Sequence, residues 1–190
     1  MKLKRTSHFI GFKLDSEVFV DLYVRLQQFL HENNLRECIE MQNVLSLHTT
    51  LYYFESDIPA KDLTALKDFA AAHRDKGHKY TISINGFEYF KGDGKEVLLY
   101  VKPENESLGI LHKQLAAQFQ RDTIVDNQHA FIPHVTLFKI IDLNTYQKYR
   151  PQFEKIVHQC LEEIGSMDVC EDMHFFAVYS QAKPEIQIAL

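Results

Sequence analysis

One short pattern occurs twice in the 190-residue chain and constrains its fold more than any other feature. The repeat consists of LHTTL at residues 47–51 and PHVTL at residues 133–137, which places His48 and His134 86 positions apart. Alternating apolar and polar residues around both segments predict strands, in which residues i and i+2 point to the same side. Each strand is therefore expected to present an imidazole beside a hydroxyl, His48 with Thr50 and His134 with Thr136.

The remaining pattern predicts an α+β protein in which strands and helices follow one another twice in the same order. Helices are expected at 16–33, 59–77, 107–119 and 142–164, the last broken or kinked at Pro151. A turn over 91–94 is expected to join two strands, and Pro103 to end the second of them. No linker rich in Gly and Ser divides the chain. We therefore expect one domain over residues 1–190, made of two pseudo-symmetric lobes that share an antiparallel core. The expected strands cover residues 8–14, 44–52, 80–90, 96–101, 131–140 and 174–182.

Composition excludes several classes of protein. With 45% hydrophobic and 25% charged residues, the chain has the composition of an ordinary folded protein rather than of a disordered one. A net charge of −5 argues against a protein that coats a long stretch of nucleic acid. Three widely spaced cysteines without a C-x-x-C pair indicate neither a disulfide framework nor a zinc knuckle. We expect a cytoplasmic monomer with no signal peptide and no membrane span.

Two histidine–threonine pairs that face one another would suit a phosphodiester substrate. Its cleavage needs one group that takes a proton from the attacking oxygen and another that gives a proton to the departing oxygen. Imidazoles, which titrate near neutrality, can do both. The hydroxyls of Thr50 and Thr136 would donate hydrogen bonds to the non-bridging oxygens. This chemistry requires no metal or other cofactor, and no HExxH or clustered ligand spacing supports the alternative of a zinc site.

A structural interpretation of the repeat stays open at this point. The chain has ten histidines, threonine favours strands, and a half-buried histidine can simply be satisfied by a neighbour. In that case both motifs would be coincidental and the chain would be a plain structural domain.

Other residues near the motifs have weaker claims to a functional role. Tyr52 and Phe138 share the expected site-facing side of their strands and would either stack on a base or belong to the core. His8 and His129 could reach the site, although each is more easily interpreted as a core or surface histidine. Lys139 is expected on the opposite face of its strand, which leaves its link to a phosphate doubtful.

The two motifs resemble the signatures of the 2H phosphoesterase superfamily, which has two His-x-Thr/Ser motifs on the central strands of a bilobal fold. The resemblance covers most of the chain and includes the proline directly before His134. It implies a LigT-like fold, in which two antiparallel sheets form a central groove with helices on the outside. One departure is Thr49, where many relatives have an aliphatic residue. Because this side chain is expected in the core, its hydroxyl would need a partner there.

The resemblance also implies a function and roles for the motif residues. His48 and His134 would be the acid/base pair, in an order the sequence does not reveal, while Thr50 and Thr136 would hold the phosphate. The LigT-like group is named for 2′–5′ RNA ligase activity, and the resemblance implies that it hydrolyses 2′,3′-cyclic phosphate RNA ends, commonly leaving a 2′-phosphate. The expected partner is an RNA terminus or a small cyclic nucleotide. A binding module for a nucleotide such as AMP or CMP, similar to the central domain of certain A-kinase anchoring proteins, is the alternative.

Overall fold

The structure is a computed structural model of the chain. It describes residues 7–54, 60–74, 81–91, 97–104, 106–119, 131–168, 173–178 and 185–189. The statements below concern these residues.

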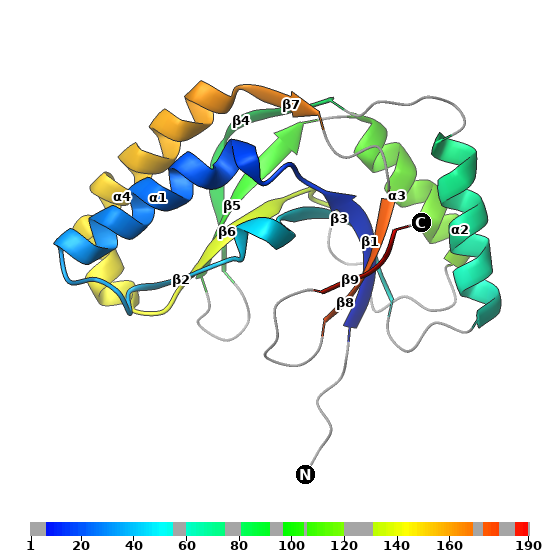
Figure 1. Cartoon of the computed structure of the whole chain (residues 1–190), viewed down its shortest axis with the longest axis horizontal. Helices are drawn as coiled ribbons and strands as arrows, with labels where there is room; N and C mark the ends of the chain where they lie inside the picture. The colour runs from blue at the N-terminus through cyan, green and yellow to red at the C-terminus, as the bar shows by residue number, and fades with distance from the viewer. Residues whose placement is uncertain are drawn as a thin grey trace, which may run out of the picture.

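Two antiparallel sheets form the frame of the molecule (Figure 1). The first has the strand order β3-β1-β8-β9 and the second the order β2-β6-β5-β4-β7. The first sheet contains β1 (Ser7–Lys13), β3 (His48–Phe54), β8 (Met173–Val178) and β9 (Glu185–Ala189). The second contains β2 (Ile39–Met41), β4 (Thr81–Lys91), β5 (Val97–Glu104), β6 (Val135–Ile140) and β7 (Ser166–Asp168).

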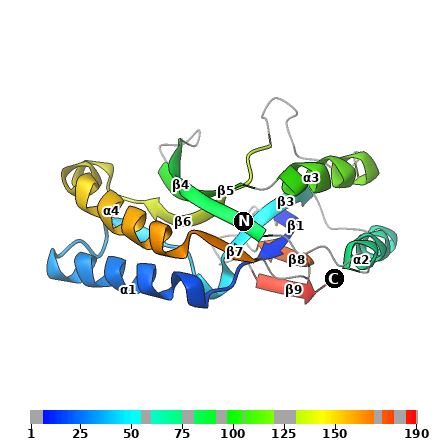
Figure 2. The same ribbon diagram turned by 90° about the horizontal axis from the view of Figure 1, so that it is seen from above.

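Two of the described helices cross over to the sheet of the other lobe. Helix α1 (Glu17–Glu32) follows β1 of the first sheet, yet it packs beside α4 (Leu143–Ile164) over the second sheet (Figures 1 and 2). Helix α3 (Glu106–Phe119) follows β5 of the second sheet, yet it packs against β3 of the first, on the same side of the molecule as α2 (Ala60–Arg74). A short 3₁₀ helix, η1 (Val44–Ser46), leads into β3. The lobes are therefore tied together by exchanged helices.

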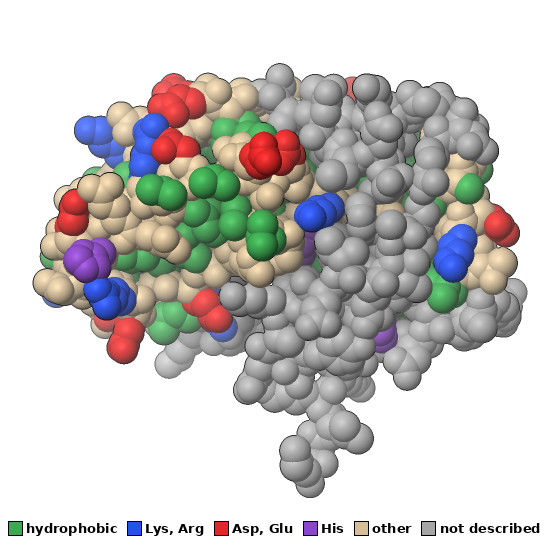
Figure 3. All heavy atoms as spheres, viewed as in Figure 1, with side chains coloured by type: hydrophobic (Ala, Val, Ile, Leu, Met, Phe, Trp, Pro, Cys, Tyr) green, Lys and Arg blue, Asp and Glu red, His purple; other side chains and the backbone are tan. Residues whose placement is uncertain are grey.

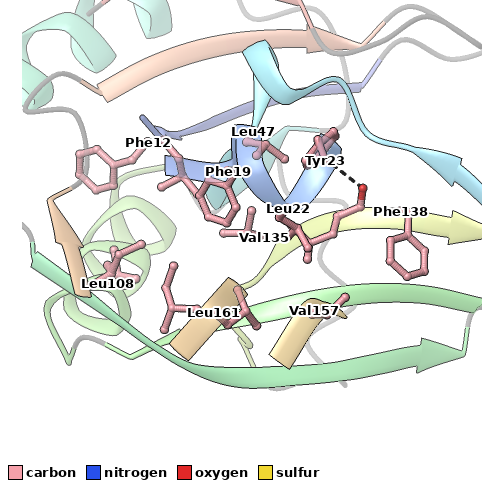
Figure 4. Packing of buried hydrophobic residues seen from close by; sticks show 14 of the residues in the cluster. Phe12, Phe19, Leu22, Tyr23, Leu47, Leu108, Val135, Phe138, Val157 and Leu161 are labelled. Carbon is pink, nitrogen blue, oxygen red and sulfur yellow. Dashed lines mark hydrogen bonds between the residues drawn. The ribbon is translucent and has the colours of Figure 1, made fainter. Parts of the chain in front are cut away.

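One continuous apolar cluster runs through both lobes (Figure 4). Helix α1 shows why the elements form, because its apolar residues recur every three or four positions and turn one face inward. Phe19, Leu22, Leu26 and Leu30 on that face are all buried. Each such side chain contributes about 1.5–3 kcal/mol when fully buried. In α4 the Asp142 carboxylate accepts a hydrogen bond from the Thr145 N–H at 3.0 Å and caps the helix, which begins where the sequence predicted.

The structure corrects several expected boundaries. Residues 44–46 form a 3₁₀ helix rather than the start of a strand, and residues 131–134 precede β6 instead of belonging to it. The expected strand over 174–182 is β8, which begins at Met173 and is described to Val178. The sequence pattern did not predict the strands β2, β7 and β9, of which the first two have three residues each. The predicted turn residues 92–94 and His129 lie outside the described residues.

The two prolines predicted to interrupt elements are less disruptive than expected. Pro151 lies inside α4, which continues without a break, because a single missing N–H is outweighed by the buried face of a 22-residue helix. Pro103 pairs with Ile84 inside β5. The pairing with β6 has already ended at Val101, so Pro103 has a strand neighbour on one side only. Its missing N–H therefore costs no ladder bond on the side of β6.

The face of the molecule drawn in Figure 3 has hydrophobic side chains over the half formed by α1. The exposed apolar residues of α1 and η1 are Val20, Val24 and Leu45. Within the described residues, no helix combines the length and the apolar character needed to cross a bilayer.

Candidate active site

The two motifs occupy equivalent places in the two lobes. His48 is the first residue of β3 and His134 directly precedes β6. The strand pairing repeats in register, because Thr50 pairs with Gly11 of β1 and Thr136 pairs with Tyr100 of β5. Strands β3 and β6 belong to different sheets but contact each other where the lobes meet. Each motif strand is therefore paired with its neighbour in the same way, β3 with β1 in one sheet and β6 with β5 in the other.

Each motif strand carries a β-bulge directly after its threonine. The register shifts between the Ile10–Tyr52 and Gly11–Thr50 pairs, so Leu51 is the extra residue in β3. The same shift makes Leu137 the extra residue in β6. A bulged residue interrupts the alternation of sides, so residues beyond it face the opposite way from what a regular strand predicts.

The bulges overturn the prediction that Tyr52 and Phe138 face the site. Tyr52 is 1% exposed and Phe138 is fully buried, and both belong to the apolar core. The Tyr52 hydroxyl donates to the Phe119 carbonyl of α3 at 3.0 Å, which fixes the ring inside the first lobe. Neither ring has a face that a base could stack on.

In each strand, a residue further along takes the place expected for Tyr52 or Phe138, on the side that carries the motif threonine. The Thr50 hydroxyl donates a long hydrogen bond of 3.4 Å to the Tyr53 hydroxyl, so Tyr53 lies on the same side as Thr50 and is 38% exposed. Beyond Leu137, Lys139 lies opposite to the buried Phe138 and therefore on the side of Thr136. The expectation that Lys139 faces away is wrong for this reason. In β1, Lys13 pairs with His48 and shares its side of the sheet.

The two imidazoles are held in the same way. The Nδ1–H of His48 donates to the Ser46 carbonyl at 2.8 Å, and the Nδ1–H of His134 donates to the Ile132 carbonyl at 2.9 Å. A carbonyl only accepts, so Nδ1 carries the proton in both neutral rings. Proton transfer to or from each ring therefore takes place at Nε2, which accepts a proton in the neutral ring and donates one in the imidazolium.

Aromatic rings surround both imidazoles. Phe9 of β1 stacks on His48 with ring centroids 4.7 Å apart. Phe90 and Tyr100 meet His134 edge-on, with centroids 5.0 and 5.7 Å away. The Tyr100 hydroxyl donates to the Glu88 carboxylate at 2.7 Å, which holds its ring in place. These contacts fix both ring planes while reducing their access to water.

Burial favours the neutral form of both histidines. Burial, together with a smaller effect of the His134 charge, lowers the pKa of His48 to about 4 against the opposing effect of the Ser46 carbonyl. Burial also lowers the pKa of His134, against the effect of the Ile132 carbonyl. The effect of His134 on His48 means that the two rings lie close enough for their charges to interact.

The remaining predicted residues are placed as follows. Thr50 is buried next to the bulge, whereas Thr136 is partly exposed. His8 is buried and pairs with Phe54, on the side of the sheet that faces away from His48. Its neighbour Phe9 stacks on His48, so His8 points to the opposite side of β1.

Gly11 makes room for the first motif. A Cβ at this position would collide with the Thr49 carbonyl oxygen and crowd the Thr50 Cα. Only glycine lets the β3 backbone come this close at the bulge. Nothing in the sequence pattern indicated this, because the glycine lies inside a regular strand pattern.

The signal that could have revealed Tyr53 and Lys139 is the repeated leucine after each threonine, which occupies the bulge in both lobes.

Comparisons with known proteins agree with this architecture. The sequence profile of the 2′-5′ RNA ligase superfamily matches residues 25–167. E. coli LigT complexed with 3′-AMP aligns at 15% identity over 97% of this chain and 95% of its own, with a TM-score of 0.61. TT0787 of Thermus thermophilus aligns at 16% identity over 96% and 95% of the two chains, with a TM-score of 0.57. Kluyveromyces marxianus Usb1 with uridine monophosphate aligns at 11% identity over 94% and 96%, with a TM-score of 0.53.

A search of curated protein sequences finds no significant match. At identities this low, the solved structures establish the fold alone. The expected bilobal α+β fold with antiparallel sheets is confirmed.

Proposed function

Because the chain belongs to the 2′-5′ RNA ligase superfamily of 2H phosphoesterases, we propose that it hydrolyses 2′,3′-cyclic phosphates at RNA ends or in small cyclic nucleotides. The observation that carries the proposal is the matched pair of imidazoles, His48 and His134. Each donates from Nδ1 to the carbonyl two residues earlier and exchanges protons at Nε2. Two such groups are what general acid–base cleavage of a phosphodiester requires.

The proposed reaction is an attack of water on the phosphorus. One imidazole takes the proton of the attacking water at its Nε2, while the imidazolium of the other gives its proton to the departing ribose oxygen. The P–O bond to the 3′-oxygen breaks as the new P–O bond forms, which leaves a 2′-phosphate and a free 3′-hydroxyl. The hydroxyls of Thr50 and Thr136 donate to the non-bridging oxygens as their charge grows. If a 5′-hydroxyl takes the place of the attacking water, the same proton transfers join two ends through a 2′–5′ bond and release the same 3′-hydroxyl.

A bound phosphate favours the protonated imidazole that the reaction needs. The lowered pKa values leave both rings neutral at pH 7 in the free protein. An anion between them favours the imidazolium and raises their pKa values. A bound anionic substrate thus favours the imidazolium form of one ring, while a positive charge on His134 opposes protonation of His48.

We infer that the substrate is small or a chain terminus. With a net charge of −5, the chain lacks the excess of basic residues that proteins use to bind a long stretch of nucleic acid. Two of the relatives compared are complexed with nucleoside monophosphates, 3′-AMP in LigT and uridine monophosphate in Usb1.

The described cysteines Cys38 and Cys160 are both unpaired, as suits the reducing cytoplasm in which we propose that the protein acts as a monomer.

The test is product analysis with purified protein. An RNA oligonucleotide that ends in a 2′,3′-cyclic phosphate and the four cyclic mononucleotides are incubated with and without EDTA, and products are separated by chromatography. We expect chelator-insensitive conversion to the 2′-phosphate. His158→Ala, which changes an exposed histidine of α4, is the matched control and should leave the rate unchanged. Tight binding of nucleoside monophosphates without turnover of any cyclic phosphate would instead favour the binding module, and strong activation by added zinc or magnesium would contradict the two-histidine mechanism.

A further inference from the structure

The carbonyl of each bulged leucine accepts a hydrogen bond from a side chain of a distant helix. The His112 Nδ1–H of α3 donates to the Leu51 carbonyl at 2.7 Å. The Tyr23 hydroxyl of α1 donates to the Leu137 carbonyl at 3.2 Å, as the dashed line in Figure 4 shows. These carbonyls belong to the residues at which β3 and β6 change sides, directly after Thr50 and Thr136.

The two contacts are related by the internal symmetry of the fold. Gly11 and Tyr100, which pair with the two motif threonines, lie 89 residues apart. Tyr23 and His112 also lie 89 residues apart, on the helices that follow β1 and β5. These are the two exchanged helices, so in each case a helix of one lobe reaches the bulge of the other. Different side chains perform the same task at equivalent places.

The surroundings show how each contact is held. Tyr23 is 7% exposed, and the Leu137 carbonyl also accepts from the Gln42 N–H at 2.8 Å. Leu51 lies on β3, the edge strand of its sheet. The His112 ring stacks face to face on Phe131, with centroids 4.1 Å apart and planes 5° from parallel. Phe131 lies three residues before His134, so His112 contacts the segments of both motifs.

We propose that Tyr23 and His112 are positioning residues that hold the two bulges, and with them the direction in which the motif side chains point. The proposal rests on the proposed function, since it concerns the same site. Neither residue touches the reacting atoms; each acts through a backbone carbonyl. Loss of the hydrogen bond lets the bulge shift along its strand, and a displacement of the motif on the scale of an ångström is enough to slow catalysis roughly 100-fold.

The exchange of helices makes the proposal specific. Tyr23 comes from the lobe of His48 but holds the bulge beside Thr136, so its loss should disturb His134. His112 comes from the lobe of His134 but holds the bulge beside Thr50, so its loss should disturb His48. A contribution to overall stability alone would not produce this crossed pattern.

The experiment compares three variants of the full chain by NMR and kinetics. Tyr23→Phe removes only the hydroxyl, and His112→Phe removes the N–H donor but keeps a ring on Phe131. His112→Asn restores a donor near the Nδ1 position. We expect Tyr23→Phe to shift the imidazole signals and titration of His134 while those of His48 stay unchanged, and His112→Phe to do the reverse. In both, kcat should fall about 10- to 100-fold with little change in KM, and His112→Asn should recover much of it.

The outcomes separate this proposal from the proposed function. Unchanged imidazole titrations in Tyr23→Phe and His112→Phe, or equal shifts of both histidines in each variant, would overturn the positioning roles whatever happens to stability. The NMR comparison needs no turnover. The imidazole titrations therefore test the positioning roles even if the wild-type protein does not hydrolyse cyclic phosphates. Tyr149→Phe, which removes the hydroxyl of a partly exposed tyrosine of α4, is the control and should leave both histidines unchanged.

Discussion

At the scale of single residues, Thr49 is one of two positions at which the first motif differs from the second, the other being Leu47, where the second motif has Pro133. Its side chain is fully buried, and its hydroxyl has no hydrogen-bond partner among the described residues. The equivalent residue in the second motif is Val135, which is buried as well. The sequence indicated that a buried hydroxyl would need a partner here, and the described part of the structure provides none. A buried hydroxyl without a partner costs free energy.

Thr49→Val is therefore expected to stabilise the protein. Valine has nearly the same shape and removes the unsatisfied group, so the free energy of unfolding should rise by about 1 kcal/mol, as measured by urea denaturation. Because Thr49 faces the core, turnover should not change. Thr50→Val, which alters the neighbouring hydroxyl on the side of the motif, is the matched comparison and should lower activity. A loss of stability in Thr49→Val would show that the hydroxyl has a partner after all.

The titration of His48 gives a second prediction at this scale. Its pKa of about 4 lies below the ordinary value of 6.5, so the native protein should take up this proton only near pH 4. Between about pH 6.5 and 4 the unfolded chain binds the proton and the native chain does not, so stability falls as the pH is lowered through this window. An NMR titration of the imidazole checks the value, and saturating inorganic phosphate should move it upward. A midpoint near the ordinary value without phosphate would contradict the burial described above.

At the scale of elements, the β-bulges decide which residues the site contains. Strict alternation from the sequence placed His48 with Thr50, and His134 with Thr136, on common sides, and these pairs precede the bulges. The same rule failed for Tyr52, Phe138 and Lys139, which follow them. A bulge depends on how two strands pair over a long range, so a rule based on local alternation could not reveal it.

Gly11→Ala tests the packing at the first bulge. The added Cβ would overlap the Thr49 backbone, which cannot move aside as a flexible side chain could. We expect a loss of about 1–3 kcal/mol in the free energy of unfolding, together with weaker activity, because β3 must shift at the motif. Gly109→Ala is the control, since a Cβ there meets no atom within 4 Å. Equal stability of the two variants would mean that β1 and β3 pair less closely than described.

At the scale of the whole molecule, the sequence predicted the repeat and the class of fold, whereas the exchange of α1 and α3 came only from the structure. Repeated motifs and the order of elements are local features that a single sequence displays. Which sheet a helix covers depends on packing between distant segments, and the apolar stripe of α1 fits either lobe. For the same reason nothing in the sequence distinguished Tyr23 and His112, because their partners, the Leu137 and Leu51 carbonyls, lie in distant segments.

The central claim concerns two imidazoles from two lobes that act on one phosphate. The measurement that tests it most directly is kcat/KM for hydrolysis of a 2′,3′-cyclic phosphate RNA end by His48→Ala, His134→Ala and the double variant. Groups that act as a unit are not additive, so each single variant should lose about 10²- to 10⁴-fold and the double variant little more. A wild-type rate in either single variant would contradict the account, as would losses that multiply in the double variant.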